Sequence, residues 1–278
     1  MTFSKIILRG LLAFVAICVV QVVAGMLVPM KPVAVPGLLL WMLLTTALTV
    51  AALSIVAART DRRGWLLGAE VAAIPLVVFC IDLIEGVVFL PNAGIDWGRI
   101  FLYTLVSAVL SIPVWTLLFG MRREASPDHY QPIRAKSWAE RAWKFALCDL
   151  TYLFLYFAAG TIIFPYVKDF YATQHLPSAG QIVALQLFVR GPMFVLLALA
   201  LTRMLGLPRT SGAIAVGVVF TFLTGVVPLL TPNPFFPDVV RWVHFAEVTS
   251  ENFVFAAVVA WLWGPPKLAQ PQALQQAA

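Results

Sequence analysis

Charged residues are scarce in this chain of 278 residues, since only 12% are Asp, Glu, Lys or Arg, against roughly 25% in ordinary soluble domains. Hydrophobic residues make up 61% of the sequence. This composition argues against a soluble globular domain and indicates a membrane protein whose main partner is the lipid bilayer. The net charge of +6 does not indicate nucleic-acid binding, because the basic residues lie in short loops between apolar runs.

Cysteine is rare, and the familiar catalytic motifs are lacking. Cys18, Cys80 and Cys148 each lie within an apolar stretch with no C-x-x-C spacing, so we predict neither disulfides nor a cysteine metal site. The sequence contains no G-x-x-x-x-G-K-[ST] phosphate loop, serine elbow, H-E-x-x-H zinc motif or dinucleotide fingerprint. We therefore expect no resident cofactor, and ATP-driven work would require a partner subunit.

Long apolar runs dominate what is present. A membrane-spanning helix needs about 20 predominantly apolar residues, and eight segments of the sequence meet this requirement. We therefore predict an all-α, polytopic integral membrane bundle with eight transmembrane helices. The predicted spans are 6–28, 37–58, 65–90, 100–120, 143–167, 181–205, 211–230 and 239–264.

Basic residues are distributed unevenly between the two sides of these spans. Of the 19 Lys and Arg residues, 14 lie on one side, four on the other, and Arg190 lies inside a span. Because cytoplasmic loops are richer in Lys and Arg, we expect both termini to be cytoplasmic, in agreement with an even number of spans. The expected location is a bacterial inner membrane.

The connection after the fourth predicted span is unusually long and basic. It divides the chain into a first four-helix half (1–120), a basic cytoplasmic loop (121–142), a second four-helix half (143–264) and a polar tail (265–278), which we expect to be disordered. Asp96 and Arg99 of the first half correspond to Asp238 and Arg241 of the second at an offset of about 140 residues. Duplication into two parallel halves and chance similarity between apolar segments are both compatible with such matches.

The last predicted span carries ionisable residues at membrane depth. Arg241, His244, Glu247 and Glu251 fall within an arc of about 120° on a helix. Such groups cost about 2.5–3.5 kcal/mol each on insertion scales, so they usually face the protein interior and often mark function. At a rise of about 1.5 Å per residue, His244 and Glu247 lie in the outer half of the membrane and Glu251 lies past its midplane. Arg241, with Asp238, is expected in a solvated outer vestibule.

Two other spans carry charge at a similar depth, Asp82 and Glu85 on the third and Arg190 on the sixth. Convergence of these charges would leave few of them unpaired. We therefore predict one cluster that contains Asp82, Glu85, Arg190, His244 and Glu247, with Glu251 as a deeper sixth candidate. Pro192 follows Arg190 closely and is expected to interrupt the helix there.

Three functions are compatible with this cluster. The leading hypothesis is a transporter of a small solute or an ion, in which carboxylates beside a histidine relay protons. The second is an intramembrane enzyme that uses the histidine and carboxylates as acid–base groups, and the third is an assembly or sensor subunit whose charges are interhelical ion pairs. A single histidine makes a poor zinc site, so no metal is predicted. Asp149 in the fifth span is either a further relay position or a partner of Lys144.

Overall fold

The computed structural model describes residues 2–30, 37–90, 95–121, 137–174, 176–232 and 236–265. These residues are almost entirely helical and contain no strand. Eight helical segments among them are long and apolar enough to cross a membrane. The prediction of an all-α bundle with eight spans is therefore confirmed.

Each predicted span corresponds to one helical segment. The first four are α1 (Phe3–Leu27), α2 (Leu38–Arg59), α3 (Gly64–Phe89) and α4 (Trp97–Trp115), which a π-helical turn, η1 (Thr116–Gly120), extends. The fifth is α5 (Trp138–Tyr171), and the sixth consists of α6 (Ala179–Leu185), η2 (Gln186–Arg190) and α7 (Gly191–Leu205). The last two are α8 (Arg209–Thr221) with η3 (Phe222–Val226) and α9 (Val227–Leu230), and α10 (Asp238–Trp263).

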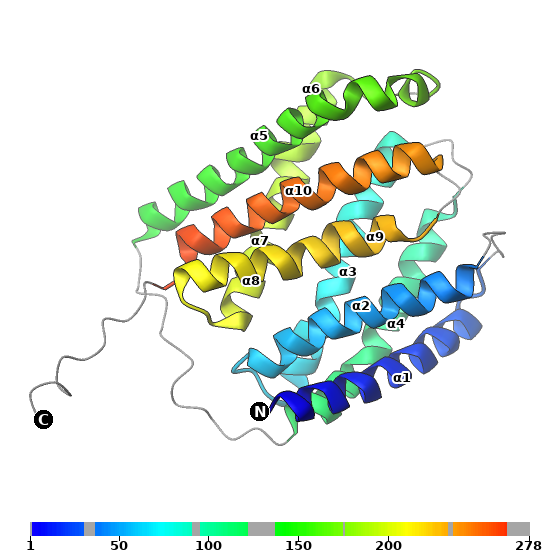
Figure 1. Cartoon of the computed structure of the whole chain (residues 1–278), viewed down its shortest axis with the longest axis vertical. Coiled ribbons are helices and arrows are strands. Elements are labelled where there is room, and N and C mark those ends of the chain that lie inside the picture. The colour runs from blue at the N-terminus through cyan, green and yellow to red at the C-terminus, as the bar shows by residue number, and fades with distance from the viewer. Residues whose placement is uncertain are drawn as a thin grey trace, which may run out of the picture.

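The helices form two layers (Figure 1). In the front layer the neighbours are, in order, α5, α10, α8 with α9, α2 and α1. Behind them α7 packs against α10, α8, α5 and α3, and α3 packs against α4. Large side chains such as Leu53, Trp115, Phe194, Phe220 and Phe255 fill the core. At one edge of the bundle, α1 exposes most of its apolar side chains, as a lipid-facing helix does.

The sixth span changes from an α-helix to a π-helical turn, η2, which ends at Arg190, where the sequence predicted an interruption. Its π turn ends directly before Gly191 and Pro192, and the Gly191 N–H donates to the carbonyl of Gln186, five residues earlier. A proline ring clashes with the carbonyl four residues before it, and a π turn accommodates this clash without ending the helix. The same arrangement recurs at η3, before Pro228. Such π turns are frequent at functional sites.

The fifth helix is longer than predicted, because it begins at Trp138. Residues 138–142, which we predicted to belong to the basic loop, are helical. The Ser137 hydroxyl accepts a hydrogen bond from the Glu140 N–H at 3.1 Å, and this N-cap starts the helix ahead of its apolar part. The remainder of the predicted loop and the tail from residue 266 lie outside the described residues.

Candidate functional site

Arg190 is the centre of a buried hydrogen-bonded group in the sixth span. It ends the π turn η2, and its Nη1 donates to the Glu85 carboxylate of α3 at 2.7 Å and to the Gln186 side-chain oxygen at 3.1 Å. The same Gln186 oxygen accepts a hydrogen bond from the Tyr152 hydroxyl of α5 at 3.0 Å. These four residues therefore connect three separate spans through one continuous chain of hydrogen bonds.

A second polar group lies on α10, nearer the predicted outer end. Nδ1 of His244 lies 2.6 Å from Oε2 of Glu247, and Nε2 lies 2.8 Å from the hydroxyl of Tyr171, the last residue of α5. The spacing of three residues places His244 and Glu247 on one helix face, and their side chains are only 15% and 9% exposed. A tyrosine, a histidine and a carboxylate in series can pass a proton, since an imidazole both donates and accepts.

The other two predicted residues lie between or beside these groups. Glu251 interacts electrostatically with Glu247, Arg190 and Glu85. Asp82, one turn before Glu85 on α3, interacts electrostatically with Arg190 and Glu85. The structure thus places all six predicted residues in one region, although neither Asp82 nor Glu251 forms a hydrogen bond with another residue of the described ranges.

Some buried polar atoms of this region form no hydrogen bond with any described residue. Four of its buried polar atoms have no hydrogen-bond partner among the described residues: Asp149 Oδ1, Gln186 Nε2, Arg190 Nε and Glu251 Oε2. Buried polar groups are normally paired, because each unpaired one costs about 1–3 kcal/mol. The region can therefore still bind an ion, a small polar ligand or water.

One face of α5 runs alongside both polar groups. Four side chains of this α5 polar face fall within an arc of about 100°: Asp149, Tyr152, Tyr156 and Tyr171. Tyr156 interacts electrostatically with Arg190 on one side and with Glu247 on the other. Gly160 lies on the same face, where a Cβ would be 3.7 Å from the Glu247 carboxylate. The α5 polar face therefore links the two groups.

Arg241 does not face a solvated vestibule, so that prediction was wrong. It is 3% exposed, and its Nη1 donates to the carbonyl oxygens of Leu229 and Leu230 at 3.0 Å each, while Nη2 binds Asp238 at 2.9 Å. The last carbonyls of a helix have no helical partner, and Arg241 supplies one at the end of α9. Arg241 therefore supports the fold and stands outside the six-residue cluster.

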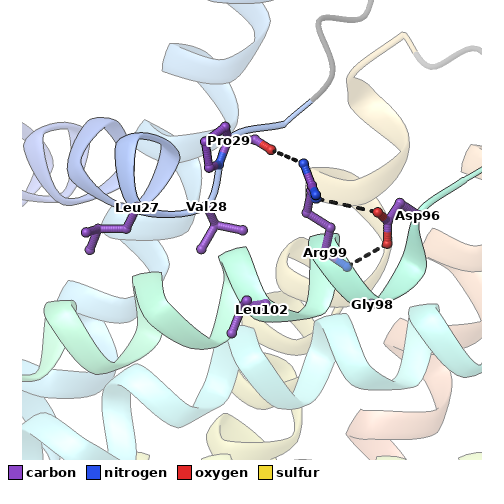
Figure 2. A pocket seen from close by; sticks show the side chains of 7 residues that line it. All are labelled: Leu27, Val28, Pro29, Asp96, Gly98, Arg99 and Leu102. Carbon is purple, nitrogen blue, oxygen red and sulfur yellow. Dashed lines mark hydrogen bonds and ion pairs between the residues drawn. The ribbon is translucent and has the colours of Figure 1, made fainter.

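A surface pocket of about 490 Å³ lies where the C-terminal end of α1 meets the N-terminal end of α4 (Figure 2). Arg99 crosses it, donating from Nη1 to the Pro29 carbonyl at 2.9 Å, and the Arg99 N–H donates to Asp96 at 3.0 Å. None of the six predicted site residues lines this pocket. It is a feature of the rim of the first half.

Three members of the two polar groups were not predicted from the sequence. Gln186 lies four residues before Arg190, a spacing at which helical side chains meet, so this contact could have been found. Tyr152 and Tyr171 gave no such signal, because tyrosines in a membrane helix also pack as aromatic side chains or lie at the interface. Only the packing of α5 against α10 and η2 shows their role.

No group of three or more His, Cys, Asp or Glu side chains in the described ranges is arranged to hold a metal ion. Comparisons of the chain with protein-family models, with curated proteins and with solved structures find no match.

Proposed function

We propose that this chain is a transporter that moves protons, alone or with a small solute, through the charged cluster. The main supporting observation is that Arg190 and Glu251 of this cluster, and Gln186 beside them, each have a buried polar atom with no hydrogen-bond partner among the described residues. Unpaired buried polar atoms in the cluster can bind an ion, a small polar ligand or water.

The charge balance of the cluster favours a positively charged cargo. The cluster contains four carboxyl groups, those of Asp82, Glu85, Glu247 and Glu251, and one arginine, Arg190, which interacts with Glu85, Asp82 and Glu251. Several carboxylates in a low-dielectric region repel one another, and the cluster lowers this energy when it binds protons or another small cation. Glu247 and its hydrogen-bonded His244 are the groups best placed to exchange protons with the outside, because they lie nearest the predicted outer end.

We further propose that both termini are cytoplasmic, as the distribution of basic residues predicts, in a bacterial inner membrane. In this orientation the Tyr171–His244–Glu247 group lies toward the outside and the Arg190 group lies deeper. A proton that enters at His244 would pass through Glu247 toward Glu251 and the Arg190 group.

Proton flux into proteoliposomes tests this function. The full-length protein is reconstituted, a potassium diffusion potential is imposed, and an entrapped pH dye reports proton entry. We expect flux above that of protein-free vesicles, and a decrease of at least about tenfold in His244→Ala and Glu247→Gln, in line with the loss of a proton-transfer group. Asp169→Asn, an exposed aspartate on α5, is the matched control and should keep the wild-type rate. Equal flux in wild type and Glu247→Gln would contradict the proposal.

The second candidate is a purely structural role, in which the charges hold the helices together. The 2.7 Å ion pair that joins Arg190 to Glu85 across two spans favours it. On this alternative, His244→Ala and Glu247→Gln would lower thermal stability and the yield of folded protein, and the folded wild-type protein would conduct no protons. Loss of proton flux in variants that unfold at the wild-type temperature would exclude a purely structural role of the cluster.

A further inference from the structure

Asp149 is a buried carboxyl group on the predicted cytoplasmic side of the cluster. It lies on the α5 polar face, one turn before Tyr152, and is 8% exposed. Its Oδ1 receives no hydrogen bond from any described residue. This oxygen lies directly against Gly191, the residue after the π turn, where an added Cβ would collide with it.

A second acceptor lies next to this oxygen. The backbone carbonyl oxygen of Gln186 is 2.8 Å from the position of the same Gly191 Cβ, so it and Asp149 Oδ1 are neighbours. The carbonyl accepts a hydrogen bond from the Gly191 N–H, and a carbonyl oxygen has two lone pairs. Two neighbouring acceptors without a donor repel each other, and a buried carboxylate without a partner is costly. A protonated carboxyl group would supply the missing O–H.

No nearby cationic side chain among the described residues forms an ion pair with the Asp149 carboxylate that would neutralise it in place of a proton. On α5 itself and on the elements packed against it, the ionisable residues besides Asp149 are Glu140, Arg141, Lys144, Cys148, Tyr152, Tyr156, Tyr166, Lys168, Asp169, Tyr171, Arg190, Arg203, Asp238, Arg241, His244, Glu247 and Glu251. Lys144 forms an ion pair with Glu140 at 2.7 Å, and the Arg190 guanidinium binds Glu85. Asp149 forms no ion pair with any residue in the described part of the chain.

We propose that Asp149 is an inner proton-binding station, protonated in the resting protein. Binding combines the carboxylate with one proton to give a neutral carboxylic acid, and release reverses this step without any other reactant. From Asp149 the α5 polar face leads to Tyr152, which is hydrogen-bonded to Gln186 and through it to Arg190. The role of Asp149 as the inward end of a proton route rests on the proposed transport function, whereas its protonation does not.

Infrared spectroscopy of the full-length protein in lipid nanodiscs tests the station. A protonated carboxylic acid has its own carbonyl stretching band, separate from that of a carboxylate. At neutral pH we expect a band in wild type that is lost in Asp149→Asn, a substitution of nearly the same shape, and retained in the exposed control Asp169→Asn. If Asp149→Asn does not fold, Asp82→Asn with carboxyl-labelled aspartate decides. Asp149 is then the one buried aspartate among the described residues, because Asp61, Asp96, Asp169 and Asp238 are exposed.

Each outcome has a defined meaning. Identical bands in wild type and Asp149→Asn, or no aspartic acid band in labelled Asp82→Asn, would overturn the proposal. Loss of the wild-type band when choline chloride is replaced by sodium chloride would assign the station to sodium and would also overturn it. If the band is present but the wild-type protein moves no protons, the transport function fails and the protonation of Asp149 stands. If both hold, Asp149→Asn should lower the flux at least about tenfold.

Discussion

The two halves of the chain share a helical frame and differ in what they bury. In each half the third span packs along the fourth, α3 on α4 and α8 on α10, and the first span also packs on the fourth, α1 on α4 and α5 on α10. Each fourth span begins with an Asp-x-x-Arg pair, Asp96 with Arg99 and Asp238 with Arg241. Both arginines donate to a backbone carbonyl at the end of another span.

The difference lies in burial and polarity. The Arg99 side chain is 50% exposed, whereas that of Arg241 is 4% exposed. The second half supplies most of the candidate site, and the first half contributes only Asp82 and Glu85 from α3. The helical packing that the two halves share is therefore separable from the site. An Asp-x-x-Arg pair supports both halves, whereas most site residues, among them Gln186 and His244, come from the second half.

The largest loss of stability is expected from Arg190→Ala, which removes the central residue of the site in the second half. The change removes the partner of Glu85 and of the Gln186 oxygen, and truncation of one member of a buried ion pair costs roughly 3 kcal/mol or more. Because Glu85 is 34% exposed, its charge is not fully buried and we expect the low end of this range. Unfolding in mixed detergent micelles measures the free energy. The double variant Arg190→Leu with Glu85→Leu should recover part of the loss, and wild-type stability in Arg190→Ala would refute the central position of Arg190.

The sequence predicted the frame because the membrane imposes strict requirements on it. Each span needs a long apolar run, and each charge within a run stands out against that background. Asp82, Glu85, Arg190, His244 and Glu247 were found in this way, and their depth followed from the helical rise. The cost of leaving charges unpaired then predicted that they would lie in one region.

The remaining parts of the site depend on how the spans rotate and pack. Tyr152 and Tyr171 became recognisable only when α5 was seen to face η2 and α10. Arg241 was misplaced for the same reason, since depth along a helix does not show that the end of α9 lies beside it. The unpaired Oδ1 of Asp149 depends on the π turn and on Gly191, which no periodicity in the sequence predicts.

An intermediate effect should separate the two arginines of the frame. Arg241→Ala leaves the Leu229 and Leu230 carbonyls without their donor, and we expect a loss of roughly 2 kcal/mol, as for buried groups left unpaired. Arg99→Ala removes an exposed ion pair and should cost at most about 1 kcal/mol. The same unfolding assay compares the two variants. Similar losses would mean that burial does not distinguish the two pairs.

The smallest effect concerns the close contacts between the third and fourth spans. A Cβ on Gly68 of α3 would collide with the Thr116 hydroxyl and lie 2.6 Å from the Ile112 carbonyl, whereas one on Gly217 of α8 would lie 3.0 Å from the Phe253 ring. A ring can shift, but a helical carbonyl is fixed by the backbone, so Gly68→Ala should destabilise by about 1–2 kcal/mol more than Gly217→Ala. Thermal unfolding of the two variants measures the difference. A larger loss of stability for Gly217→Ala would place the tighter helix contact in the second half, which carries most of the polar cluster. The helix packing and the site would then no longer be separable.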